Sequence, residues 1–455
     1  MSSPLENPAF ARLFAAQLLS LVANGLVVVA LALSAYAFRP EAAGALLATA
    51  LIGKMLVYVT VAPVVGAYID RLPRRNWLVT LDLARAGVLL WLAIVGSSVA
   101  FVLLVAVFYM FSAAFTPVYQ AAIPDLLDDE QYVQALSWSR LAQELEGMAG
   151  PLLAAGLLFV ADHTQLYVLS AALLLGSATL VWWSRVPPAA ASERAGGVLH
   201  NLLFGIHAYT RTPRLRGLLA LHAVVSFSGA LVIVNTVVLV REYFELPEHW
   251  VPLTAGAAGV GAVLAAWSVP SLLRRTNTRT VMFSGALIAL LGLGLGVATR
   301  SHVAVLCVWF LVGVGGSLIL TPSGRIIIAS CHDSDRSALF ATNFSLSHGI
   351  WLLAYASAGF LGAVLPVEAW FWLHAALSGL SLLLALRLWP RDDPDDLPHR
   401  HDVLDHDHLH THDAHHQHSH EGWEGPEPHR HPHHHDATEH AHPFVIDEHH
   451  RHWPR

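Results

Sequence analysis

The chain has 455 residues, of which 55% are hydrophobic and 13% charged, and its mean hydropathy is +0.51. These values exclude a single soluble globular domain and are usual for a membrane protein with several spanning helices. The two cysteines, Cys307 and Cys331, exclude a disulfide scaffold and a Cys-x-x-Cys site for metal or redox chemistry. The first apolar run is too long for a secretory signal and lacks a small-residue cleavage pattern, so we expect no cleaved signal peptide.

Twelve apolar stretches are long enough to cross a bilayer. A hydrocarbon core of about 30 Å needs about 20 apolar residues in a helix, and backbone groups in lipid must be paired within their own segment. We therefore predict an all-α integral membrane protein with helices near 12–36, 44–69, 77–96, 99–122, 134–160, 165–185, 215–240, 252–273, 279–298, 302–325, 340–364 and 368–388. The predicted domains are a six-helix half at 1–186, a cytoplasmic connector at 187–213 that begins with a flexible stretch at 187–197, a second six-helix half at 214–390 and a tail at 391–455.

Arginine placement predicts the orientation of these helices. The loops on one side contain most of the arginines: Arg71, Arg74, Arg75, Arg194, Arg211, Arg214, Arg274, Arg275, Arg279 and Arg336. The other side offers little beyond Arg39, Arg241 and Arg300. The positive-inside rule then places both termini and the tail in the cytoplasm.

The two halves carry faint traces of one repeat. Thr116-Pro117 recurs about 205 residues later as Thr321-Pro322, and Asn24-Gly25 in the first helix corresponds to Ser228-Gly229 in the seventh. Two six-helix halves in parallel repeat resemble the major facilitator transporters, which handle substrate between the halves near the middle of the membrane.

The loop after the second helix carries the motif that is most specific to this superfamily. Residues 66–75 read Gly-Ala-Tyr-Ile-Asp-Arg-Leu-Pro-Arg-Arg, which resembles its Gly-x-x-x-Asp-Arg-x-x-Arg-Arg signature. The resemblance implies a cytoplasmic charge latch that breaks and reforms as the halves rock; the alternative is an ordinary basic loop. The latch residues are Gly66, Asp70, Arg71, Arg74 and Arg75, with Asp82 and Arg85 on the next helix in support. The second half keeps Arg274, Arg275 and Arg279 without the acid, so its latch should be weaker.

Two further segments are similar to exporters of this superfamily. The segment from Pro117 to Asp125 resembles the one that follows helix four in macrolide- and siderophore-efflux proteins. Helix five carries a glycine–proline pattern similar to that of proton antiporters, formed by Gly147, Gly150, Pro151 and Gly156. Simple packing of small residues between helices is an equally good explanation of the second pattern.

Polar side chains inside the predicted helices are costly and are therefore candidates for transport and coupling. Lys54, the only lysine, lies about ten residues into the second helix, roughly 15 Å deep, and needs an acidic partner or a water-filled cavity. Glu146 is a better proton-linked carboxylate than Glu144, which can pair with Arg140 one turn away. The remaining candidates are His222, His348, His374, Asn24, Asn235 and Asn343, of which His222 and His348 are the preferred pair.

The tail from His399 to His452 contains 20 of the 29 histidines. From Arg391 onward it also has 15 acidic residues against 5 arginines, a balance that suits cations and excludes nucleic acid. Imidazole is the commonest ligand for borderline divalent metals, and alternate spacing in an extended chain places successive rings on one side. We predict a disordered tail that binds metal through His406, His408, His410, His412, His415, His416, His418, His420, His429, His431, His433, His434 and His435.

With this tail, the chain resembles the nickel-resistance exporters of the NreB type. The resemblance implies a bacterial inner-membrane exporter of Ni²⁺, with Co²⁺ as a second substrate, that exchanges metal for protons and needs no cofactor. Imidazole also suits zinc and copper, so the residues alone leave the metal open. One alternative is a proton-coupled exporter of a macrolide- or siderophore-like compound with a metal-buffering tail. Another alternative is a metal sensor or storage protein, but such a protein would need neither the latch nor the charged residues inside the membrane. No catalytic motif in the sequence suggests an enzyme.

Overall fold

The computed structural model describes most of the chain. The described residues are 3–68, 73–123, 126–127, 131, 135, 138–139, 142, 150–184, 198–331, 336–391, 396–401, 404–410, 429–435 and 438–443. Within them, ten helices are long and apolar enough to cross a membrane. The membrane-spanning part of the protein is therefore all-α, as the sequence predicted.

The helices of the first half agree closely with the predicted spans. This N-half (described residues 3–184) contains η1 (Pro4–Glu6), α1 (Pro8–Phe38), η2 (Pro40–Ala42), α2 (Ala43–Tyr68), α3 (Arg74–Leu92), α4 (Ser98–Ala122) and α6 (His163–Trp183). Residues 150–157 are also helical and fall within the predicted fifth span.

The second half follows a connecting helix, α7 (Val198–Arg211). This C-half (213–391) contains α8 (Pro213–Val238), η4 (Leu239–Tyr243), α9 (Trp250–Leu273), α10 (Thr278–Gly296), α11 (His302–Ile328), α12 (Arg336–Ala356), η6 (Ser357–Leu361) and α13 (Val367–Leu388). The stretch expected to be flexible, 187–197, lies outside the described residues, and the rest of the predicted connector is α7, which packs against α12 and buries Ala208 and Tyr209.

Local sequence explains why several helices begin where they do. Asn7 caps α1, with its side-chain oxygen accepting from the amides of Ala9 at 2.9 Å and Phe10 at 3.3 Å, and Pro8 occupies the first helical position. Asp162 forms a capping box with Gln165 at the start of α6. These side chains satisfy amides that would otherwise lack partners at the helix ends.

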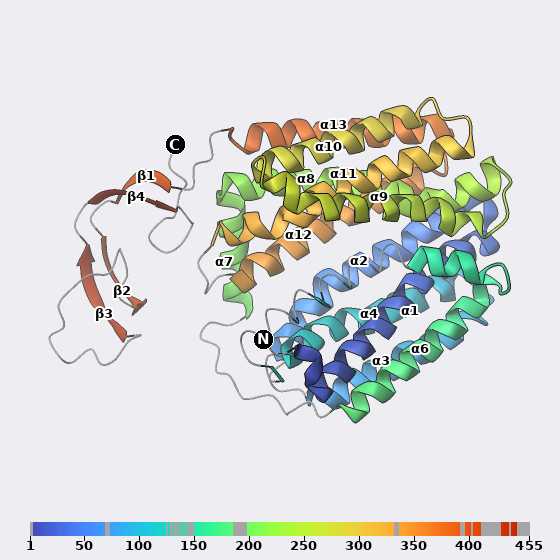
Figure 1. Ribbon diagram of the computed structural model, residues 1–455, viewed down its shortest axis with the longest axis horizontal. Coiled ribbons are helices and arrows are strands. Elements are labelled where there is room, and N and C mark those ends of the chain that lie inside the picture. The colour runs from blue at the N-terminus through green and yellow to red at the C-terminus, as the bar shows by residue number, and fades with distance from the viewer. Residues whose placement is uncertain are drawn as a thin grey trace.

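The two halves repeat one packing pattern (Figure 1). In the N-half α1 packs on α6 and α2 on α4; in the C-half α8 packs on α13 and α9 on α11. The contact of α3 with α4 is repeated by that of α10 with α11. This correspondence is the structural form of the faint repeat in the sequence.

Both halves have their chain ends on one side of the bundle. We call the side where α1 begins and α13 ends the terminal end, and the opposite side the far end (Figure 1). The predicted orientation places the terminal end in the cytoplasm.

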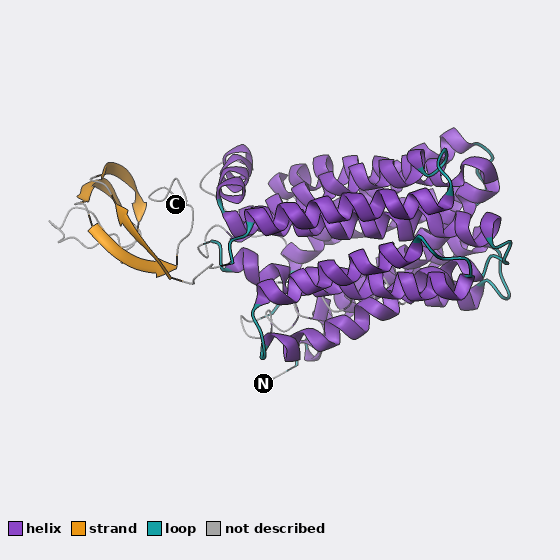
Figure 2. Cartoon of the chain, turned by 90° about the horizontal axis from the view of Figure 1, so that it is seen from above, coloured by secondary structure: helices purple, strands orange, loops and turns teal. Residues whose placement is uncertain are grey.

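The tail forms strands outside the helical bundle (Figure 2). They are β1 (Asp396–His401), β2 (Leu404–His410), β3 (His429–His435) and β4 (Thr438–Pro443), with β1 antiparallel to β4 and β2 antiparallel to β3. The expectation of a wholly disordered tail therefore does not hold for these residues. Alternation of histidine with other residues has the period of a strand, and antiparallel pairing satisfies the backbone groups.

Candidate transport site between the two halves

His348 lies on α12 where that helix faces the N-half. Its Nδ1 lies 2.7 Å from the carbonyl oxygen of Phe344, and its ring stacks on the Phe344 ring at 3.8 Å between centroids. The Tyr58 ring of α2 lies 5.8 Å away. A carbonyl can only accept, so Nδ1 carries the hydrogen and the lone pair of the neutral imidazole is on Nε2.

His222 lies on α8 and contacts α11. Its Nε2 is 3.1 Å from the Ser323 hydroxyl, which donates its single hydrogen to the carbonyl of Ile319 at 2.7 Å. Ser323 must therefore accept from His222 Nε2–H, which leaves the imidazole lone pair on Nδ1. His222 and His348 lie on α8 and α12, which pack together in the C-half, and their pairing stays a prediction.

Lys54 belongs to the same region. Its ammonium lies 4.5 Å from the centroid of the Tyr109 ring and 5.5 Å from that of Tyr58, and it interacts electrostatically with His348. Cation–π contact with two tyrosines stabilises a charge in a partly desolvated place. The carboxylates expected to serve it or the proton, Glu144 and Glu146, lie outside the described residues.

The other polar candidates are divided between packing and a small cavity. Asn235 donates from Nδ2 to the carbonyl of Ala358 at 3.2 Å, near the far end, and Asn343 accepts from the Tyr209 hydroxyl at 2.7 Å. His374 donates from Nδ1 to the carbonyl of Phe227 at 2.6 Å and is 1% exposed. Asn24 lines a cavity within the N-half.

Asp82 and Arg85 form a buried ion pair inside the N-half. Their side chains are 0% and 1% exposed. The Ser177 hydroxyl of α6 donates to Asp82 Oδ2 at 2.6 Å. On the other side, Arg85 Nη1 donates to Ser20 Oγ of α1 at 3.1 Å. These contacts tie three helices of one half together. The sequence predicted a local pair of these two residues, and its expected support of the latch stays a prediction. Two residues three apart on a helix look the same in sequence whether they are exposed or buried.

Little of the latch motif itself is described. Gly66 lies in α2, and Asp70 and Arg71 lie outside the described residues. Arg74 is 5% exposed at the start of α3, and the Arg75 guanidinium lies 5.0 Å from the centroid of the Trp182 ring.

The antiporter-like motif shows one tight helix contact. A Cβ on Gly150 would overlap the Gly25 backbone of α1, with 2.8 Å to its carbonyl carbon. A Cβ on Gly156 would meet nothing within 4 Å. Pro151 follows in the same helical segment, whereas Gly147 is outside the described residues. Gly150 thus packs helices closely, which is the simpler of the two interpretations given above.

The tail strands bring histidines opposite one another. In the β2–β3 register His406 stands opposite His433, His408 opposite His431 and His410 opposite His429. His434 and His435 also lie in β3, whereas His412, His415, His416, His418 and His420 are outside the described residues. Among the described residues, no three His, Cys, Asp or Glu side chains are placed to hold one metal ion.

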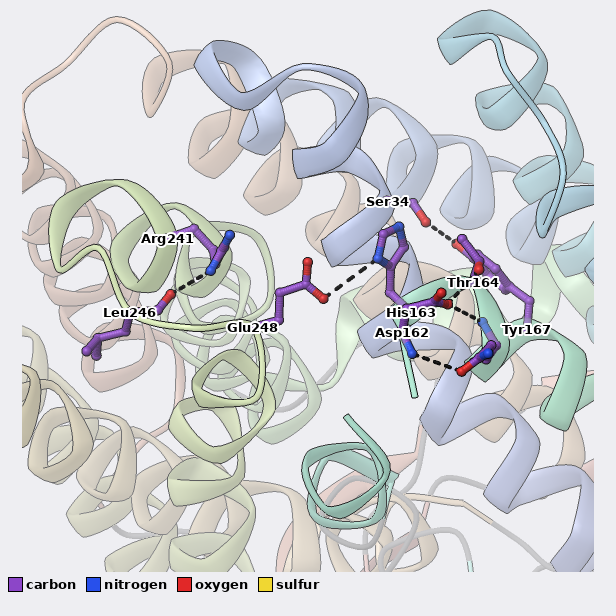
Figure 3. Close-up of polar contacts among 9 residues, drawn as sticks. Ser34, Asp162, His163, Thr164, Tyr167, Arg241, Leu246 and Glu248 are labelled. Atoms are coloured by element: carbon purple, nitrogen blue, oxygen red, sulfur yellow. Dashed lines mark hydrogen bonds and ion pairs between the residues drawn. The ribbon is translucent and has the colours of Figure 1, made fainter. Parts of the chain in front are cut away.

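The two halves meet at the far end (Figure 3). His163 Nδ1 of the N-half lies 3.8 Å from Glu248 Oε2 of the C-half, and the Phe159 and His249 rings stack at 4.5 Å. The His163 imidazole beside Glu248 holds the pKa of that carboxyl below its usual range. The Arg241 guanidinium lies 5.4 Å from the centroid of the Tyr36 ring and donates to the carbonyl of Leu246 at 2.8 Å.

Sequence reasoning missed several of these contacts. Tyr58, Tyr109, Ser323 and Phe344 surround the three predicted side chains at the site. Tyr58 lies four residues after Lys54 on one helix, a spacing that could have been noticed. The far-end pair of His163 and Glu248 joins two loops that are distant in the sequence, and no local signal marks it.

Comparison with known families decides the classification. The Major Facilitator Superfamily profile matches residues 13–307 and 271–411. The chain belongs to the major facilitator superfamily. It is therefore a transporter of the multi-pass membrane class, and a bacterial inner-membrane location is consistent with this. Comparison with curated proteins found no match.

Solved structures of this superfamily have the same fold. The nucleoside transporter NupG is 14% identical with a TM-score of 0.66, and the match covers 84% of this chain and 98% of that one. A bacterial homologue of the iron transporter ferroportin, in an inward-facing state, is 15% identical with a TM-score of 0.64 and the same coverage. A protein described as a bacterial metal transporter is 16% identical with a TM-score of 0.57, again over 84% and 98%. At these identities the similarity establishes the fold alone.

Proposed function

We propose that this chain exports a divalent metal, Ni²⁺ first and Co²⁺ second, from the bacterial cytosol in exchange for protons, and so confers metal resistance. The observation that supports the proposal is that His222 and His348, both in the C-half, each have one ring nitrogen occupied by a hydrogen bond and the other bearing a lone pair. Metal-bound histidines usually donate their second ring N–H to a carbonyl or another fixed acceptor in this way. Imidazole nitrogen suits nickel among the divalent metals.

The two ring nitrogens that bear lone pairs, Nδ1 of His222 and Nε2 of His348, can also bind the protons that are exchanged for metal. A proton and a metal ion compete for the same lone pair, so an imidazole that binds one cannot bind the other at the same time. Metal arriving from the cytosol would displace a proton, and a proton arriving from outside would displace metal. Glu146 remains the candidate for an additional proton-binding carboxylate.

The tail would act as an accessory to this site. Three directly opposed histidine pairs in β2 and β3 concentrate imidazole in a short segment. A tethered metal-binding segment raises the local metal concentration near the transporter without belonging to the translocation path.

The test is metal accumulation in inverted membrane vesicles, with Ni²⁺, Co²⁺ and Zn²⁺ compared with and without an imposed proton gradient. His348→Asn keeps a donor for the Phe344 carbonyl but loses the Nε2 lone pair, and His222→Gln keeps a donor for Ser323 but loses Nδ1. Both should abolish gradient-driven Ni²⁺ accumulation. His374→Asn, at a packing histidine, is the matched control and should retain it; equal accumulation by all three variants would refute the site.

The second candidate is export of a small organic compound by the same scaffold. Lys54 and the rings of Tyr58, Tyr109 and Phe344 favour it, because a fixed cation beside aromatic faces suits an organic anion better than a bare metal ion. Sensitivity of a deletion strain to macrolides and siderophore-like compounds, set against its sensitivity to nickel, separates the two functions.

A further inference from the structure

A small polar cavity lies inside the N-half, beside the transport site. It has a volume of about 50 Å³ and is formed by α1, α2, α3 and α4. Its polar lining consists of Gln17, Ser20, Asn24, Tyr58, Arg85, Ser112 and Tyr119. About 10–15 Å³ of such space is enough for one water, so this cavity has room for a few waters or for a carboxylate group.

Two polar atoms of the lining residues lack a hydrogen-bond partner among the described residues: Nε of Arg85 and Oδ1 of Asn24. The hydroxyl of Tyr119 makes no well-formed hydrogen bond and lies beside Ser139, which donates its own hydrogen to Gln17 Oε1 at 3.0 Å. Buried polar groups are almost always paired, so poorly satisfied groups on three residues around one cavity indicate a bound group.

The missing group can be described by what these atoms require. Arg85 Nε–H and the Tyr119 hydroxyl can each donate to an oxygen, which matches the two oxygens of a carboxylate. Asn24 Oδ1 needs a donor close to that carboxylate, such as a hydroxyl or an ammonium group. An α-hydroxy- or α-amino-carboxylate supplies both, and such compounds also chelate divalent metals through the same pair of groups.

Tyr58 connects this cavity to the imidazole pair. It lines the cavity, its ring lies 5.8 Å from that of His348, and the Lys54 ammonium lies 5.5 Å from its centroid. A ligand with its carboxylate in the cavity can therefore extend past Tyr58 towards the two imidazoles. Lys54 is then beside an anionic chelator, and the conflict between a fixed cation and a cationic cargo disappears.

We propose that this cavity is a carboxylate subsite, and that the exported species is a divalent metal chelated by an α-hydroxy- or α-amino-carboxylate. The inference rests on the proposed function, because it specifies the form in which the metal is carried. The N-half holds the chelator and the C-half supplies imidazole to the metal.

Double-label uptake tests the inference in inverted vesicles that contain the full-length protein. Vesicles receive ⁶³Ni²⁺ with ¹⁴C-citrate in one arm and with ¹⁴C-histidine in another, which separates the hydroxy-acid from the amino-acid chelator. Co-accumulation of both labels in a constant ratio in either arm is the expected result. Accumulation of ⁶³Ni²⁺ with neither organic label overturns the inference and leaves the proposed function intact, whereas accumulation of an organic label without nickel overturns both.

A single hydroxyl provides the matched variant. Tyr119→Phe removes a single hydroxyl and leaves the ring in place, so folding should be preserved. KM for the chelate should rise about tenfold or more, as expected for the loss of one hydrogen bond to a charged group. Tyr243→Phe, at an exposed tyrosine near the far end, is the control and should leave KM unchanged. An unchanged KM in Tyr119→Phe would show that the cavity holds water only and would overturn the assignment.

Discussion

Closure of the far end depends on one glycine of η6. Gly359 of the C-half packs on α2 of the N-half, where a Cβ would overlap the Ala48 side chain and lie 2.8 Å from the Gly44 carbonyl oxygen. Neither obstacle is the flexible end of a long side chain, so Gly359→Ala can be accommodated only if the halves move apart. Overpacking of this kind costs about 1–3 kcal/mol.

This cost falls only on the conformation in which the far end is closed. A differential free energy of about 1–3 kcal/mol shifts a two-state equilibrium about 5- to 150-fold. Gly359→Ala should therefore populate a far-end-open state and slow gradient-driven metal accumulation. Gly349→Ala is the matched control, because a Cβ on Gly349 of α12 meets nothing within 4 Å.

Pulsed electron spin resonance measures this shift directly. Val160 in the N-half and Val364 in the C-half are 85% and 76% exposed near the far end, so spin labels there should perturb the fold little. The native cysteines, Cys307 and Cys331, are first replaced by serine. Gly359→Ala should add a population at longer distance. If its distance distribution matched those of Gly349→Ala and the parent protein, the argument that this contact closes the far end would be refuted.

Three further predictions concern charge, the tail and the buried pair. Because its histidine partner lowers the pKa of Glu248, the carboxylate supports closure above its ordinary pKa and loses this effect as pH falls through the lowered value. Spin labels should therefore detect opening of the far end as the pH falls in the parent protein, but no such pH dependence in Glu248→Gln. At neutral pH, Glu248→Gln should destabilise the closed far end by only about 0.2–1 kcal/mol, since the pair is partly exposed. Deletion of residues 399–455 should weaken nickel resistance without abolishing it; complete loss of uptake by well-expressed protein would contradict the accessory role. Ser177→Ala, which removes a donor from buried Asp82, should destabilise the protein by about 1–3 kcal/mol in thermal unfolding in detergent.

The spanning helices could be predicted because backbone N–H and C=O groups in lipid must be hydrogen-bonded within their own segment, which favours the helix. The span predicted at 302–325 is α11 (His302–Ile328), and that predicted at 279–298 is α10 (Thr278–Gly296). Ser301 and Asn277, whose side chains accept amide hydrogens, mark both starts. By contrast, α7 was missed because its stability comes from burial of Ala208 and Tyr209 against the C-half, which local sequence does not reveal.

The candidate site could be predicted only in part. His222 and His348 were paired because their helices belong to one half around the expected cavity, and those helices, α8 and α12, pack together. The lone pairs of the two imidazoles could not be assigned from sequence, because that assignment depends on Ser323 and on the Phe344 carbonyl. Nothing in the sequence marks Tyr119, since the surroundings of its hydroxyl are defined only by the folded structure.

The division of ligands between the halves bears on how transport could be coupled. In this arrangement Lys54, Asn24 and Arg85 belong to the N-half, and both imidazoles belong to the C-half. A cargo bound by one half alone is coupled to the rocking of the halves through access and through proton exchange, because a ligand with equal affinity for two states does not shift the equilibrium between them. A chelate that spans both halves gives up contacts with one of them when they separate, so its affinity must differ between the two conformations. Binding that bridges the halves therefore adds a difference in affinity to the proton exchange proposed for the two imidazoles.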